Sequence, residues 1–202
     1  MAEKPILFST DMVKAILEGR KTQTRRVITV HWHKGTRTTP YEPYYIESDG
    51  KLLYMDEYGD YHPMENVCPH GRPGTVLWVR ETWCPGYYAD GRVGYKADWQ
   101  NPDPRVVAET NWKPPIHMPR EAARLFLEVK SVRVERLQDI TPEDCEAEGM
   151  DAYCDDGVHD PGDAMYLQFS ELWDSINGNR GYGWDKNPWV WVVEFKRVEV
   201  SE

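Results

Sequence analysis

Long apolar runs are missing from this chain of 202 residues. No stretch approaches the roughly 20 residues that a membrane-spanning helix needs. The N-terminal Met-Ala-Glu-Lys-Pro also lacks a signal-peptide core. Cysteine is scarce, and Cys68, Cys84, Cys145 and Cys154 form no Cys-x-x-Cys pair. We therefore expect reduced thiols, a cytoplasmic location and no membrane partner.

Positive charge is in the minority. The chain has 24 lysines and arginines against 34 acidic residues, which gives a net charge of −10. A protein that coats long nucleic acid needs a broad basic surface. Only residues 20–26 are strongly basic. The charge therefore favours a small nucleoside, or a short RNA held at one local patch.

Phenylalanine is also rare, with four residues against nine tryptophans and twelve tyrosines. Tryptophan and tyrosine combine a large apolar ring with a polar group, so they suit a core beside a cleft and can stack on bases. Hydrophobic residues make up 40% and charged residues 29% of the chain, as expected for a folded globular protein. The length predicts a single domain over residues 1–202, with loop insertions at about 31–73 and 85–119.

Hydrophobic periodicity predicts an α+β fold. We expect a small curved antiparallel sheet or partial barrel with helices at its side. The predicted strands are 6–8, 22–30, 75–83, 123–137 with a bulge near Ser131, and 189–200, with a hairpin around 45–58. The predicted helices are one capped by Ser9 or Thr10 and ended by Gly19, a short one from Thr141, and one over 163–177. In the last helix the expected core residues are Met165, Phe169, Leu172, Trp173 and Ile176.

One basic segment contains the residues that are the best candidates for a functional site. Residues 19–26 read Gly-Arg-Lys-Thr-Gln-Thr-Arg-Arg, directly after the first predicted helix. Lys21 and Thr24 place a primary amine near a hydroxyl, a pair that suits hydrolysis or anion binding. Residues three apart on a strand point to opposite faces, so the two converge only if the backbone turns near Lys21. The alternative is a solvated basic turn.

The spacing Gly19-x-Lys21-x-x-Thr24-x-Arg26 resembles the G-x-K-x-x-T-x-R signature of the ASCH domain, a relative of the PUA-like β-barrels. Phage and prophage members of that family look similar over most of this chain. The resemblance extends to residues 77–83, 116–120, 172–177 and 187–191. It implies a PUA-like barrel with a cleft between barrel and helices, lined by the signature.

One branch of that family, shorter than this chain, hydrolyses the acyl amide of N4-acetylcytidine with a lysine, a threonine and a glutamate. The resemblance implies the same catalytic roles for Lys21, Thr24 and Glu148, although Glu146 lies only two residues away. Glu148 would lie at the negative end of its helix, which favours proton uptake by a general base. Lys21 would be an electrostatic clamp, and Thr24 or a water that it holds would be the nucleophile. In the competing assignment a neutral Lys21 activates Thr24.

The expected substrate-binding residues are Arg20, Arg25, Arg26 and Glu81. For Arg25 and Arg26 the alternative is a structural role, in which Arg26 would brace the turn through a carboxylate such as Glu81. We expect no cofactor and no metal. A zinc site built from His31, His33, Cys68 and His70 is disfavoured by its irregular spacing.

Two other functions remain open at this point. A non-enzymatic module that binds RNA or a nucleotide would keep the same cleft, and a ribonuclease would use it for RNA. A binder of RNA needs a basic surface beyond residues 20–26, whereas a nucleoside hydrolase needs only an aromatic-lined pocket. The net charge of −10 therefore favours the hydrolase.

Overall fold

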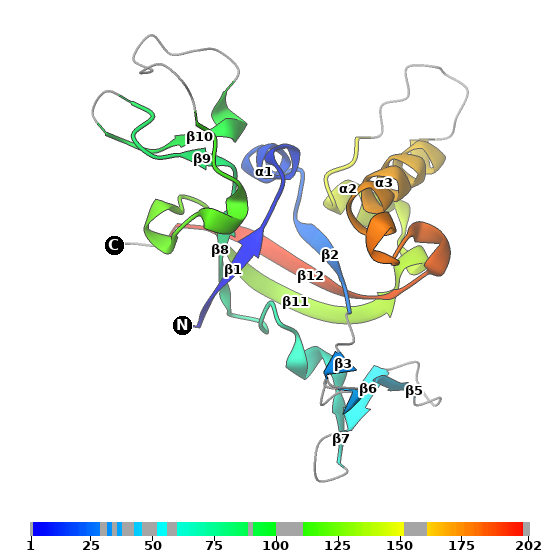
Figure 1. Ribbon diagram of the computed structural model, residues 1–202. Helices are drawn as coiled ribbons and strands as arrows, with labels where there is room; N and C mark the ends of the chain where they lie inside the picture. The colour runs from blue at the N-terminus through cyan, green and yellow to red at the C-terminus, as the bar shows by residue number, and fades with distance from the viewer. Residues whose placement is uncertain are drawn as a thin grey trace.

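A five-stranded sheet in the order β1-β8-β11-β12-β2 forms the centre of the protein (Figure 1). Its strands are β1 (Glu3–Leu7), β8 (Val76–Arg80), β11 (Phe126–Arg136), β12 (Trp189–Val198) and β2 (Gln23–Val27). The computed structural model describes residues 2–28, 32–33, 36–37, 43–45, 52–55, 60–88, 91–99, 111–151 and 161–199. The curved sheet with helices at its side confirms the predicted α+β class.

The sheet is antiparallel in three of its four pairings, and β1 pairs with β8 in parallel. The predicted antiparallel sheet thus includes one parallel pair. A helix, strand β2 and the first insertion separate β1 from β8 in the sequence, a connection long enough for a parallel crossover. Strands β1 and β2 are the two edges of the sheet, and the Arg26 Nη2 of β2 donates a 2.6 Å hydrogen bond to the Leu7 carbonyl of β1.

The inner face of the sheet carries the main core. Leu125, Leu127 and Val129 alternate toward this face, and all three are buried. The pairing of β11 with β12 shifts register between Val129 and Ser131, which confirms the predicted bulge. Other members of this core are Ile6, Phe8, Val13, Ile16, Leu77, Val79, Trp191, Val193 and Phe195.

Helix α1 (Thr10–Leu17) lies above this sheet (Figure 1). The Ser9 hydroxyl caps it by accepting a hydrogen bond from the Met12 N–H. Helices α2 (Pro142–Ala147) and α3 (Pro161–Asn177) pack together at one end of the sheet. Their core contains Leu137, Cys145, Met165, Phe169, Trp173, Val190 and Val192. Ile176 was expected in this core but is 44% exposed, because it lies near the end of α3 where the helix reaches the rim of a pocket.

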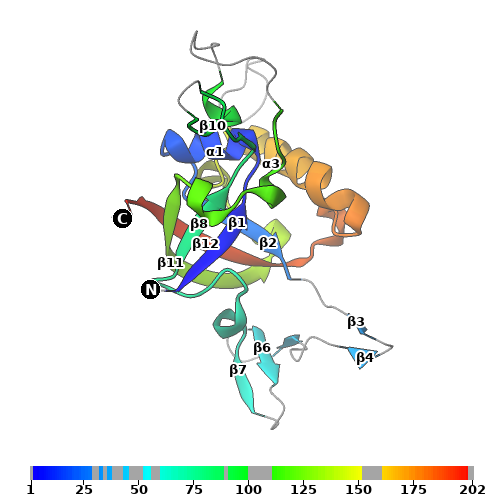
Figure 2. The ribbon, with the colours of Figure 1, turned by 60° about the vertical axis from the view of Figure 1, so that its left-hand side comes forward.

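The two segments predicted to be insertions carry small elements of their own. The first contains β3 (Trp32–His33), β4 (Thr36–Arg37), β5 (Pro43–Tyr45), β6 (Leu52–Met55) and β7 (Tyr61–Pro63). The antiparallel pair β5–β6 confirms the predicted hairpin, and these strands lie on the side of the sheet opposite α1 (Figures 1 and 2). The predicted strand 75–83 is interrupted after Arg80, and β9 (Trp83–Cys84) pairs instead with β10 (Gly94–Tyr95).

Single turns of 3₁₀ helix complete the described part of the chain. They are Met64–Val67, Lys96–Asp98, Pro115–His117, Arg120–Ala122, Leu137–Asp139, Gly178–Arg180 and Trp184–Lys186. Among the residues described, no helix combines the length and apolarity that crossing a bilayer requires.

Candidate functional site

The exit from α1 makes the backbone turn that the Lys21–Thr24 spacing requires. Gly19 adopts a left-handed conformation with φ of 80°, and the Arg20 and Lys21 N–H groups both donate to the Ala15 carbonyl at 2.9 and 3.0 Å. The Thr22 N–H then donates to the Ala147 carbonyl at 2.8 Å, which ties this turn to the end of α2. The turn therefore brings the basic segment against the helix that carries Glu148.

Lys21 and Glu148 form a buried ion pair. The Lys21 Nζ donates to Glu148 Oε2 at 2.6 Å and to the Glu148 carbonyl at 2.8 Å. The two side chains are 1% and 5% exposed. Burial lowers the pKa of Lys21, while the Glu148 carboxylate acts in the opposite direction. Glu146 is exposed and forms no such pair within the described part of the chain, so the structure selects Glu148 as the carboxylate that meets Lys21.

Gly149 allows α2 to approach α1 closely enough for this pair to form. It follows the C-cap residue of α2 and has φ of 93°. A Cβ atom at this position would lie 3.1 Å from the Ala15 Cβ and 3.2 Å from the Lys21 Cβ. Glycine therefore supplies both the left-handed conformation and the close approach.

We expect Gly149→Ala to destabilise the protein more than Gly19→Ala. Both substitutions force a left-handed conformation on alanine, at roughly 1–2 kcal/mol. Only the alanine at position 149 also meets side-chain atoms, because nothing lies within 4 Å of the Cβ position at Gly19. Urea unfolding of both variants tests this, and an equal loss of stability would show that close approach at Gly149 is unimportant.

A pocket of about 280 Å³ lies between β2, α3 and the segment Pro69–His70. Four predicted site residues line it: Thr24, Arg25, Arg26 and Glu148. The remaining lining residues are Met12, Val27, Pro69, His70, Phe169, Leu172, Trp173, Ile176, Asn177 and Arg180. Lys21 is not among them, so it binds the Glu148 side chain from the side away from the pocket, while Glu148 faces the pocket.

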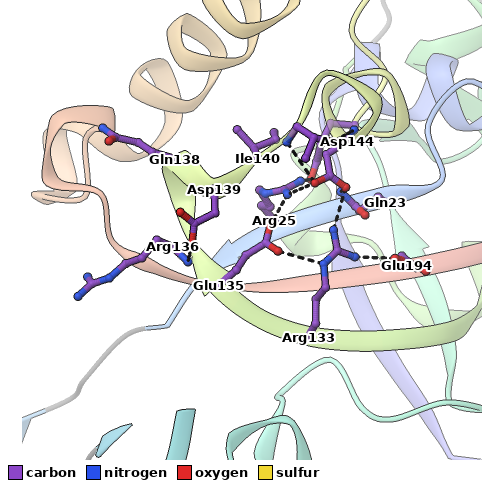
Figure 3. Close-up of polar contacts among 12 residues, drawn as sticks. Gln23, Arg25, Arg133, Glu135, Arg136, Gln138, Asp139, Ile140, Asp144 and Glu194 are labelled. Carbon is purple, nitrogen blue, oxygen red and sulfur yellow. Dashed lines mark hydrogen bonds and ion pairs between the residues drawn. The ribbon is translucent and has the colours of Figure 1, made fainter. Parts of the chain in front are cut away.

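Arg25 fixes Glu148 from a second direction. Its buried guanidinium reaches Glu148 Oε1 at 3.4 Å through Nη1 and Asp144 Oδ2 at 2.9 Å through Nη2, which also donates to Glu135. Figure 3 shows Arg25 lying between Asp144 and Glu135. Arg25 was predicted to bind substrate, but in the structure its guanidinium is engaged by three carboxylates of the protein.

Arg133 closes this charge network on its outer side (Figure 3). It donates to Glu135 Oε2 at 3.0 Å, to Asp144 Oδ1 at 2.8 Å and to Glu194 Oε1 at 2.5 Å. Asp144 also completes the capping box of α2 with Thr141. Partial burial works to raise the pKa of Asp144, but hydrogen bonding from Gln23 and the charge of Arg25 outweigh it and lower the pKa. The network thus holds the start of the helix whose end carries Glu148.

The other predicted binding residues divide between the pocket and its surroundings. Arg26 lines the pocket, and its guanidinium lies over the Phe8 ring at 5.2 Å. Arg20 lies outside the pocket and pairs with Glu18 at 2.6 Å. Glu81 binds Arg124 through both carboxylate oxygens, at 2.9 and 3.1 Å.

The suggested brace between Arg26 and Glu81 is therefore wrong. Strand β8 ends at Arg80, and the Glu81 N–H donates to the Met118 Sδ at 3.3 Å. This places the Glu81 carboxylate against Arg124, while Arg26 binds the Leu7 carbonyl instead. Glu81 is not among the residues that line the pocket.

His70 is the titratable pocket residue that sequence reasoning considered only as a zinc ligand. Burial, followed by the charges of Arg26 and Lys4, lowers its pKa to about 4. Burial also raises the pKa of the neighbouring Cys68 thiol to about 11. His31 lies outside the described residues, and the described part of the chain contains no group of three or more potential metal ligands.

We expect His70 to make folding stability sensitive to mild acid. The folded protein resists protonation of His70 down to about pH 4, whereas the unfolded chain binds this proton near pH 6.5. Stability is therefore full above pH 6.5 and falls as the pH drops toward 4, by about 3 kcal/mol at most. Urea unfolding of the wild type and His70→Gln between these pH values measures this loss of stability. If the free energy of unfolding depends on pH in the same way in both proteins, His70 is not its cause.

Comparison with known proteins gives a weak structural likeness. The sequence matches no protein-family model, and no curated protein matches it. An ASCH domain from Lactobacillus crispatus JV V101 aligns with 97% of this chain and 79% of its own, at 14% identity and a TM-score of 0.36. That structural agreement is too low to define a shared fold, so the properties of the site are taken from the geometry of this chain alone.

Proposed function

We propose that the protein hydrolyses the acyl amide of an N-acylated pyrimidine nucleoside such as N4-acetylcytidine. The observation that carries this proposal is the buried Lys21–Glu148 pair, whose carboxylate faces a pocket also lined by Thr24. A carboxylate, a hydroxyl and fixed positive charges around one small pocket supply the groups that amide hydrolysis needs.

Glu148 is the general base in this mechanism. Lys21 and Arg25 bind its two carboxylate oxygens and orient the group toward the pocket. The Thr24 hydroxyl, or a water that it holds, attacks the acyl carbonyl and gives its proton to Glu148. The carbon–nitrogen bond then breaks, and the same proton passes to the departing amine. An acyl group on Thr24 would be released by water in a second, equivalent step.

Lys21 acts as the electrostatic clamp. A neutral lysine that activates Thr24 would have to present its amine toward the pocket. Lys21 instead lies behind Glu148, with its Nζ bound to both the carboxylate and the carbonyl of that residue. This arrangement favours the clamp over the competing assignment.

Arg26 is placed to stabilise the oxyanion that forms during attack. It lines the pocket, and its guanidinium is held by a 2.6 Å hydrogen bond from Nη2 to the Leu7 carbonyl. A fixed positive charge at the pocket wall can stabilise the negative charge that develops during acyl transfer.

The size and walls of the pocket suit a nucleoside. A volume of about 280 Å³ is close to, and just below, the lower limit for small-molecule sites, whose range is roughly 300–1,000 Å³. Phe169, Trp173 and Leu172 supply apolar wall for a base.

Turnover of N4-acetylcytidine tests the proposed function. We expect the purified protein to release cytidine and acetate in equal amounts, as followed by chromatography. A correctly folded protein that releases no cytidine over the blank would overturn the proposal.

The second candidate is a module that binds short RNA. The observation in its favour is that three arginines, Arg25, Arg26 and Arg180, line the pocket. Such a module should bind a labelled RNA with an affinity that falls steeply between about 50 and 200 mM salt. The same incubation, run on a gel, would reveal a ribonuclease by strand cleavage.

A further inference from the structure

The segment that carries His70 is a tight turn whose backbone is fixed by hydrogen bonds and by a glycine. The Gly71 N–H donates to the Cys68 carbonyl at 3.0 Å, and Gly71 adopts φ of 97°. A Cβ atom at Gly71 would lie 2.5 Å from the Thr75 Oγ1, so only glycine fits there. The Lys4 Nζ holds the turn to β1 through a 3.0 Å hydrogen bond to the Pro69 carbonyl. These contacts fix the backbone that presents His70 to the pocket.

The imidazole of His70 is available to a ligand. It lines the pocket, and no hydrogen bond or ion pair from the described residues reaches its ring nitrogens. Its pKa of about 4 keeps the ring neutral at pH 7. A neutral imidazole offers one N–H donor and one acceptor nitrogen, without a charge that would call for an anionic ligand.

His70 and Glu148 both line the pocket, His70 from the turn that follows Cys68 and Glu148 from the end of α2. The charges that act on His70 are those of Arg26 and Lys4. Burial lowers the pKa of Arg26, and the charge of Glu148 opposes this effect. Arg26 is thus near both residues. A ligand in this pocket whose amide lies at Glu148 can therefore meet His70 with another part of its ring.

We propose that His70 is a specificity residue whose imidazole N–H donates a hydrogen bond to the ring carbonyl of an acylated pyrimidine. This inference rests on the proposed function. In a cytosine ring the acylated N4 and the O2 carbonyl lie on the same edge, separated by N3. A base whose amide meets Glu148 can therefore present O2 to His70. A donor reserved for this carbonyl selects against bases that lack an acceptor at that position.

The test compares His70→Ala and His70→Gln with the wild type, and His117→Ala is the matched control because His117 is exposed and outside the pocket. KM and kcat are measured with N4-acetylcytidine, and Kd for cytidine is measured by calorimetry. We expect His70→Ala to raise KM and Kd by about 3- to 10-fold, the size of one neutral hydrogen bond. The value of kcat should stay within about twofold, because the reacting amide lies at Glu148. The glutamine variant, whose amide can also donate, should recover at least half of the lost affinity.

A second ligand tests the bond to the ring carbonyl itself. In 2-thiocytidine sulfur, a weaker acceptor, replaces O2, so this ligand should bind the wild type and His70→Ala alike. Equal KM and Kd in the wild type and His70→Ala with the normal ligands would overturn the proposal. So would a collapse of kcat at unchanged KM, which would place His70 at the reacting centre.

Failure of the proposed function gives a different pattern. If the wild type releases no cytidine but binds N4-acetylcytidine in a His70-dependent way, the hydrolase is wrong and the assignment of His70 stands. If turnover depends on Glu148 but not on His70, the proposed hydrolase stands and the assignment of His70 is wrong. A wild type that neither turns over nor binds the nucleoside would overturn both.

Discussion

Replacing Arg25 by methionine should lower the free energy of unfolding by about 3–5 kcal/mol at neutral pH. The guanidinium is fully buried and lies against three carboxylates, those of Glu135, Asp144 and Glu148. Methionine fills a similar volume but leaves these carboxylates facing one another in a site that water reaches poorly. The cost is therefore that of carboxylates which Arg133 and Lys21 compensate only in part, and it exceeds that of a lost surface pair.

The pH dependence of this loss of stability shows whether it comes from unbalanced charge or from altered packing. In the wild type the pKa of Asp144 is lowered, so its ionisation stabilises the fold above the ordinary value of 3.8 and ceases to do so as the pH falls through the lower, folded value. Without Arg25 the carboxylates take up protons more readily. The difference between Arg25→Met and the wild type should therefore shrink as the pH falls from 7 toward 4.

Urea unfolding at several pH values measures both effects, with Arg20→Met as the control. Arg20 is 39% exposed and pairs with Glu18 at the surface, so its loss should cost less than about 1 kcal/mol. An Arg25→Met protein that is no less stable than Arg20→Met, or whose deficit does not change with pH, would contradict the role given to the network.

Replacing Glu148 by glutamine should reduce hydrolysis of N4-acetylcytidine by about 10²- to 10⁴-fold, the usual contribution of a general base. Glutamine keeps the shape of the side chain and an oxygen that can accept from Lys21, but it cannot take a proton. Binding of the nucleoside should therefore survive while kcat falls.

Glu146→Gln is the matched control for this variant. Glu146 lies two residues away on the same helix and is exposed, so its substitution should leave kcat unchanged. Unfolding curves establish that both variants are folded under the assay conditions. More than a tenth of wild-type activity in Glu148→Gln, or an equal loss in Glu146→Gln, would show that Glu148 is not the base.

The elements that the sequence predicted well are those determined by local chemistry. Ser9 caps α1, and Thr141 opens α2 with a capping box. Gly19 allows the left-handed turn after α1. These signals act within a few residues along the chain, so they can be read without knowing the fold.

The convergence of Lys21 with Glu148 was expected only from the resemblance to the ASCH family, because nothing local relates residues 127 positions apart. The bracing network was missed for the same reason. Arg133 and Glu135 look like ordinary polar positions on a strand, and only the approach of α2 to β11 and β2 brings Asp144 and Arg25 to them. The parallel pairing of β1 with β8 also depends on the path of the intervening chain.

The sequence suggested no role for His70 other than the disfavoured zinc site. Gly71 and Gly74, both with positive φ, indicate a tight turn, but no sequence signal shows which cavity that turn faces. Burial and the two nearby cations, which keep the imidazole neutral, are tertiary properties. The size and lining of the candidate pocket therefore required the structure.

A crystal structure of the Glu148→Gln variant with N4-acetylcytidine would test the central claim most directly, because this variant should bind the substrate without cleaving it. We expect the nucleoside in the pocket between β2 and α3. Its acyl carbon should lie within about 3–3.5 Å of the Thr24 hydroxyl, or of a water held between Thr24 and the glutamine side chain introduced by the substitution. A nucleoside bound elsewhere on the protein, or one whose amide points away from position 148, would contradict it.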